Sequence, residues 1–121
     1  MSLKRLLKSF RDAFRGLEHA FWHEQNFRIQ IFLAIVVLIL TVIFPLKTWE
    51  IVMLILLIVA VLTVELLNTA LEYFADLLKP RLNHYVFVIK DLMAGAVLIS
   101  SMGALAIGLI IFLPHFLGLL K

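Results

Sequence analysis

The chain has 121 residues, of which 64% are hydrophobic and 16% are charged, and its mean hydropathy is +1.09. Ordinary soluble domains are only about 45–50% apolar, so this composition excludes that class and predicts a protein embedded in a lipid bilayer. The net charge of +3 fits attraction to anionic lipid headgroups and requires no nucleic-acid partner. The absence of cysteine excludes disulfides, thiolate metal sites and a cysteine nucleophile.

Residues 1–24 are predicted to form an amphipathic helix. Leucine and phenylalanine recur at spacings of three and four from Leu3 to Phe21, whereas lysine, arginine and acidic residues occupy the opposite face. A helix with this pattern lies in the membrane interface with its apolar face toward the lipid.

Three apolar stretches follow, and each is predicted to cross the membrane as a helix, over residues 27–46, 49–70 and 91–119. A crossing needs about 20 mostly apolar residues. The second stretch reaches that length only by including Glu65 and Asn68. The sequence therefore predicts a single all-α integral-membrane domain over residues 1–121, with one surface helix and three transmembrane helices.

The basic residues predict the orientation of this domain, because lysine and arginine in short loops stay on the cytoplasmic side. Nine of them lie before the first span or between the second and third spans, and only Lys47 and Lys121 lie on the other side. We therefore expect a multi-pass protein of the cell (inner, cytoplasmic) membrane with its N-terminus in the cytoplasm. One protomer of this size is too thin to enclose a site, so a homo-oligomer is expected.

A row of polar side chains marks the end of the second span, in the segment VELLNTALEYFAD. Successive helical residues are rotated by about 100°, so Glu65, Asn68, Glu72 and Asp76 fall within a sector of roughly 80°. For Asp76 alone, a solvated helix face explains the side chain equally well. For Glu65 it does not, because a carboxylate at the membrane boundary costs a few kcal/mol unless it has a partner or a task.

Three other charged residues are expected at the same depth as this row: Glu24 before the first span, and Lys90 and Asp91 at the start of the third. Carboxylates without cysteine or a histidine pair suit Mg²⁺, which binds one or two carboxylates together with waters and substrate phosphates. A nearby lysine supplies a positive charge for phosphate oxygens. The set indicates phosphoryl transfer, with a spare carboxylate as the base. The chain has no glycine-rich phosphate loop, which excludes a P-loop enzyme.

The pattern ExxNxxxExxxD, the KD pair before the third span and the NFR segment after Glu24 resemble the small prokaryotic diacylglycerol kinase and undecaprenol kinase family. The resemblance extends from about Lys4 to about Phe112. It implies an integral-membrane homotrimer that transfers the γ-phosphate of MgATP to a lipid alcohol. It also implies that each site is shared between neighbouring subunits.

The resemblance assigns a role to each polar residue. Glu65 matches the general base that takes the proton of the lipid hydroxyl, and Asn68 matches a polar residue of the reaction centre. Six further residues match nucleotide-binding residues of the family: Glu24, Glu72, Lys90, Asp91, Asp76 and Arg5. Of these, Glu24 and Glu72 match the carboxylates that also hold Mg²⁺.

The segments NFRIQ, AGAVLIS and GLIIFLP resemble the polyprenol-phosphorylating branch of the family and favour undecaprenol over diacylglycerol as the acceptor. Three departures from the diacylglycerol kinases accompany them, one of which is Met93, Ala94 and Gly95 in place of a serine-containing stretch after the KD pair. Gln30 stands where some diacylglycerol kinases have a second acidic residue, and the loop between the second and third spans lacks their acidic character. A small proton-coupled exporter is the alternative function. It needs its carboxylate deep in the membrane, whereas the acids here are expected at one depth on one side.

Overall fold

The structure is a computed structural model that describes residues 2–120. Within these residues the chain is entirely helical and contains four helices: α1 (Leu3–His23), α2 (Gln25–Ile43), α3 (Thr48–Asp76) and α4 (Asn83–Leu119). The all-α architecture is confirmed. Helices α2, α3 and α4 are each long and apolar enough to cross a membrane.

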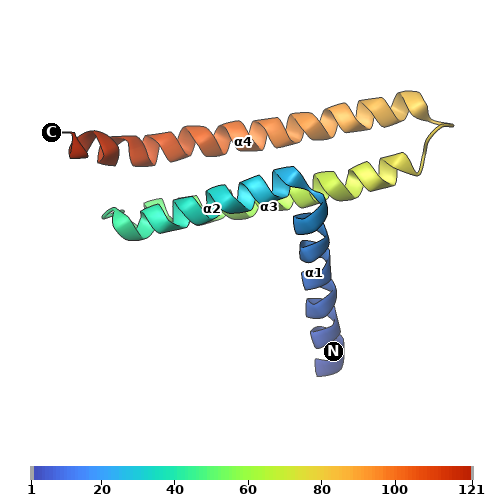
Figure 1. The fold of residues 1–121 in the computed structure, drawn as a ribbon, viewed down its shortest axis with the longest axis horizontal. Coiled ribbons are helices and arrows are strands. Elements are labelled where there is room, and N and C mark those ends of the chain that lie inside the picture. The colour runs from blue at the N-terminus through green and yellow to red at the C-terminus, as the bar shows by residue number, and fades with distance from the viewer. Residues whose placement is uncertain (1, 121) are drawn as a thin grey trace.

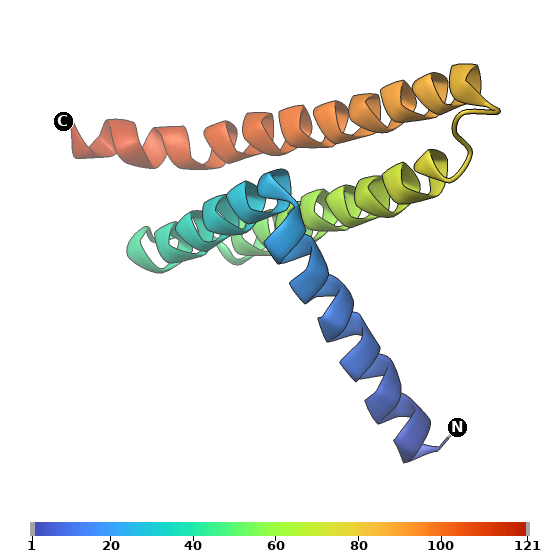
Figure 2. The ribbon, with the colours of Figure 1, turned by 45° about the vertical axis from the view of Figure 1, so that its right-hand side comes forward.

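Helix α1 stands across the direction of the other three helices and carries the N-terminus away from them (Figures 1 and 2). It begins where the Ser2 hydroxyl accepts a hydrogen bond from the Arg5 amide at 3.2 Å. It ends at Glu24, whose extended backbone (φ −117°, ψ 110°) turns the chain into α2. The apolar side chains of Leu7, Phe10 and Phe14 remain exposed on α1, as expected for a helix that meets lipid.

Helices α2, α3 and α4 run side by side, and their main cluster of buried side chains lies at the end remote from α1 (Figure 1). Phe44 follows the last turn of α2 and packs with Leu54 of α3 and with Ile111 and Phe112 of α4. Proline cannot donate a helical hydrogen bond, and Pro45 lies directly beyond this turn. The three helices are therefore held together by apolar contacts at the end opposite to the polar row.

The last turns of α3 and the first turns of α4 extend beyond the level of α1 (Figure 1). Helix α4 begins at Asn83, well before the predicted start of the third span at residue 91, so Lys90 and Asp91 lie about two turns inside a helix. Ala75 and Val86 are fully buried here. If α1 lies in the membrane interface, these extended helix ends reach into the aqueous phase and carry Asp76 and Lys90, at the outer end of the polar row, with them.

Candidate active site

Glu65 lies at the inner end of the polar row, and only 2% of its surface is exposed. Gln30 of α2 donates a hydrogen bond from its Nε2 to Glu65 Oε2 at 3.4 Å. One turn along α3, the Thr69 hydroxyl donates to the Glu65 carbonyl oxygen at 3.0 Å. This burial rules out a solvated position for Glu65. A buried carboxylate with one side-chain donor is a costly group, and such groups are common at functional sites.

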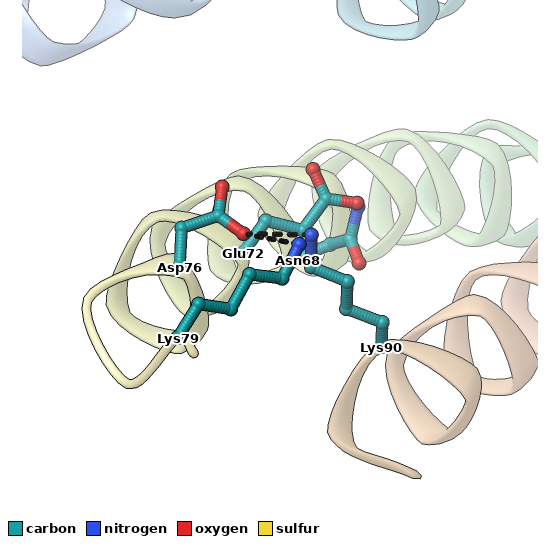
Figure 3. Close-up of polar contacts among 5 residues, drawn as sticks. All are labelled: Asn68, Glu72, Asp76, Lys79 and Lys90. Carbon is teal, nitrogen blue, oxygen red and sulfur yellow. Dashed lines mark hydrogen bonds and ion pairs between the residues drawn. The ribbon is translucent and has the colours of Figure 1, made fainter. Parts of the chain in front are cut away.

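Asn68 and Glu72 follow on the same face of α3, and both are half-buried. The Asn68 side-chain amide donates to Glu72 Oε1 at 3.5 Å, which links the two across one helical turn (Figure 3). The charges of Glu24 and Glu72 both lie close enough to repel that of Glu65. The negative charges of these three carboxylates therefore lie in the same part of the protein, although within residues 2–120 the side chains do not form one compact cluster.

Asp76 forms the outer end of the row and pairs with two lysines. Its Oδ1 lies 2.7 Å from Lys90 Nζ of α4 and 3.5 Å from Lys79 Nζ of the following turn (Figure 3). About half of the Asp76 side chain is exposed, and solvent screens ion pairs in such positions, so these pairs contribute little to stability. The main consequence of the pairs is therefore positional, because they hold the Lys90 ammonium group beside the row.

Glu24 enters the site from the junction of α1 and α2. The Tyr73 hydroxyl of α3 donates to Glu24 Oε1 at 3.4 Å, and His19 Nε2 lies 3.1 Å from the same hydroxyl. These contacts place Glu24 beside Tyr73, the residue of α3 that directly follows Glu72. The structure therefore brings together residues from three elements that are far apart in the chain.

Glu24 and Glu72 were predicted to hold Mg²⁺, and their chemistry fits that ion. Among residues 2–120, no three histidine, aspartate or glutamate side chains are grouped as a preformed metal site. Mg²⁺ does not require such a group, because it keeps several waters and takes one or two carboxylates together with phosphate oxygens. Glu24 and Glu72 are both half-buried, and the Asn68 amide contacts Glu72 at 3.5 Å.

Two predicted site residues do not join this cluster within one protomer. Arg5 lies in the first turn of α1, and at about 1.5 Å per residue it is nearly 30 Å along the helix from Glu24. Asp91 is exposed on α4 beside Lys90. Arg5 therefore does not reach the polar row of its own protomer.

Comparison with known proteins identifies the chain. Residues 11–112 match the family described as prokaryotic diacylglycerol kinase. The chain belongs to this family. The resemblance drawn from the residue pattern is thereby confirmed, and the family is one of membrane lipid kinases.

Two curated relatives of this kinase family carry different names. The chain is 38% identical over 116 residues to a diacylglycerol kinase of Synechocystis sp., a match that covers 95% of this chain and 66% of the relative. It is also 38% identical over 112 residues to an undecaprenol kinase of Bacillus subtilis, a match that covers 93% of this chain and 91% of the relative. Equal identity to the two relatives leaves the acceptor lipid to be judged from the site.

Three residues of this family member contact the site but were not predicted to do so: Gln30, Tyr73 and Lys79. Gln30 was noted only as a departure from an acidic residue. Its place in an otherwise apolar segment was the available signal, since an amide there needs a partner. Tyr73 and Lys79 had no such signal, because both lie among other polar residues.

Proposed function

We propose that this protein transfers the γ-phosphate of MgATP to the hydroxyl of a membrane lipid alcohol, with undecaprenol as the favoured acceptor and diacylglycerol as the second. The observation that supports this most directly is the buried Glu65 at the inner end of a row that continues through Asn68 and Glu72 into a charged, exposed region. A lipid hydroxyl arrives from the apolar side, and a nucleotide arrives from the aqueous side. The row spans the boundary where they must meet.

Glu65 is suited to act as the general base. As the acceptor oxygen forms its bond to the γ-phosphorus, the bond from that phosphorus to the β-bridging oxygen breaks and ADP leaves. The hydroxyl proton passes to the Glu65 carboxylate, which must come within about 3 Å of it. Asn68, one turn away, can donate a hydrogen bond to the oxygens at the reaction centre.

The outer half of the site is suited to hold the nucleotide. Mg²⁺ bound with ATP would neutralise negative charge on its phosphates, and Glu24 and Glu72 are the residues that would hold it. Lys90 can turn from Asp76 toward a phosphate oxygen as a positive point charge. Asp76 then acts as the support that keeps Lys90 near the phosphates, and Asp91 lies beside it for a further nucleotide contact.

The structure also contains an apolar cavity that could hold the hydrocarbon tail of the acceptor lipid. A cavity of about 450 Å³ lies between α2, α3 and α4 and is lined almost entirely by apolar side chains. Gln30 is a polar member of this lining, and it contacts Glu65. A tail in this cavity would bring its hydroxyl end to the base.

We further propose that the protein is a homotrimer of the cell membrane with its N-terminus and active site on the cytoplasmic side. The distribution of lysine and arginine supports the orientation. The position of Arg5 supports a shared site, because α1 extends away from its own bundle (Figure 1) and can reach a neighbour.

The function is tested by ATP consumption in detergent or bilayers with undecaprenol and diacylglycerol supplied side by side. We expect consumption to require both Mg²⁺ and an added lipid alcohol, with undecaprenol used faster. A proton-coupled exporter would consume no ATP, so an absence of lipid-dependent ATP consumption would reject the kinase. Faster use of diacylglycerol would reverse only the order of acceptors.

Gln30→Leu is expected to lower kcat by about 10-fold while the protein still assembles. The substitution removes the side chain that donates to Glu65, and a lost hydrogen bond to a charged group costs about 1.5–3 kcal/mol. Steady-state kinetics with saturating MgATP would measure the change. Gln25→Leu is the matched control, because Gln25 is exposed at the start of the same helix. Equal rates for the two variants would show that Gln30 does not act on the base.

A further inference from the structure

Glu24 occupies an unusual position for an acidic residue. It is the N-cap residue of α2, where a carboxylate would ordinarily accept hydrogen bonds from the first amides of the helix, but its side chain makes no such bond. Instead its Oε1 accepts from the Tyr73 hydroxyl at 3.4 Å. The carboxylate therefore contacts α3 and does not cap its own helix.

The hydroxyl of Tyr73 has one proton, and this determines which group is the donor in its contact with Glu24. An ionised carboxylate can only accept, so Tyr73 donates to Glu24. His19 Nε2, 3.1 Å from the hydroxyl oxygen, must then be the donor to Tyr73. The result is a chain of two hydrogen bonds from His19 through Tyr73 to Glu24.

The histidine at the start of this chain is itself fixed. The His19 ring stacks on that of His23 with 4.2 Å between ring centroids, and the Tyr73 ring meets it edge-on at 5.7 Å. His23 Nδ1 donates to the His19 carbonyl oxygen at 2.9 Å. The last turn of α1 thus presents one oriented donor to Tyr73.

We propose that Tyr73 is a positioning residue that orients the Glu24 carboxylate for the divalent cation that accompanies the nucleotide; this rests on the proposed function. Glu24 lies at a break between two helices, where its side chain would otherwise rotate freely. The Tyr73 hydroxyl occupies one oxygen and leaves Oε2 for the cation. Mg²⁺ demands nearly ideal octahedral geometry, so the orientation of a ligand matters. The same contact ties the surface helix to α3, through His19.

Tyr73→Phe is expected to weaken divalent-cation binding about 10-fold, because loss of a group that orients a metal ligand typically costs 10–100-fold in affinity. The Tyr73 side chain is 47% exposed, so loss of its hydroxyl should leave thermal unfolding in detergent nearly unchanged. Binding is measured on the full-length protein with Mn²⁺ and a non-hydrolysable ATP analogue, from the paramagnetic resonance signal of free Mn²⁺. Tyr85→Phe is the matched control, because Tyr85 is 63% exposed in the first turn of α4.

A second comparison separates positioning from a general structural effect. In a Glu24→Gln background, adding Tyr73→Phe should weaken Mn²⁺ binding no further, because the residue through which Tyr73 acts is already lost. His19→Phe, which keeps an aromatic ring but removes the donor, should weaken binding in the same direction by a smaller factor. Wild-type affinity in both Tyr73→Phe and His19→Phe, or an equal loss with and without Glu24, would overturn the proposal. Failure of the kinase proposal is seen separately, as an absence of lipid-dependent ATP consumption in the unchanged protein.

Discussion

Glu65→Gln is expected to lower kcat by 100-fold or more, the usual size of general-base effects being about 10²–10⁴-fold, with little change in the KM for MgATP. The substitution keeps the size of the side chain, and the new amide oxygen can still accept from Gln30. The fold should therefore persist while the base is lost. Steady-state kinetics over a range of MgATP concentrations, with acceptor lipid saturating, would measure both parameters.

Glu72→Gln is the matched comparison for this prediction, because it removes a charge from the same face of α3 about two turns further out. We expect this variant to raise the KM for MgATP as well as to lower kcat. A near-normal kcat in Glu65→Gln, or a loss confined to the KM for MgATP, would mean that the row binds only nucleotide and metal. The base would then lie elsewhere.

The helices and the polar row could be predicted because each depends on local sequence. A chain in lipid must satisfy its backbone groups internally, so an uninterrupted apolar stretch of sufficient length predicts a helix. The 100° rotation per residue then places Glu65, Asn68, Glu72 and Asp76 on one face without any knowledge of the tertiary structure. Of these, Glu65 is the one whose burial by α2 gives it a distinct environment.

The contacts between helices could not be predicted in this way. The hydrogen bond from Gln30 to Glu65 depends on how α2 and α3 are rotated about their axes, and hydropathy does not determine rotation. The contact of Tyr73 with Glu24 depends on the angle at which α1 leaves the bundle. The apolar stretch predicts a span over residues 91–119 but does not predict the start of α4 at Asn83, because the end of an apolar stretch marks the edge of the lipid and a helix can continue beyond it.

The depth of each group explains why the site needs residues from several elements. Glu65 is buried and is reached from the apolar cavity through Gln30. Asp76 lies about three turns further out with Lys90 beside it, and about half of the Asp76 side chain meets solvent there. Glu24 meets the row between these levels because the surface helix ends there. In the proposed kinase, a lipid hydroxyl and a water-soluble nucleotide would therefore meet at this row without either leaving its own phase.

The two carboxylates assigned to Mg²⁺ provide the second large expected effect. Glu24→Gln and Glu72→Gln should each reduce turnover by about 100-fold, as expected when preorganised electrostatic stabilisation of a charged transition state is lost. Both variants should still insert and assemble, because neither residue belongs to the apolar cluster that joins the ends of α2, α3 and α4.

The effect of these two substitutions should depend on the cation concentration, because each removes one ligand and weakens the binding of the ion. We expect the Mg²⁺ concentration for half-maximal turnover to rise in both variants, and turnover at high Mg²⁺ to recover in part. Titration of activity with Mg²⁺ at fixed total ATP would measure this. Glu18→Gln is the control, because Glu18 is an exposed acid on α1 more than one turn before Glu24. The activity of this variant should depend on the Mg²⁺ concentration as that of the unchanged protein does. Unchanged Mg²⁺ dependence in both site variants would show that the ion is held by other groups, and that Glu24 and Glu72 affect turnover only through the charge that they place near Glu65.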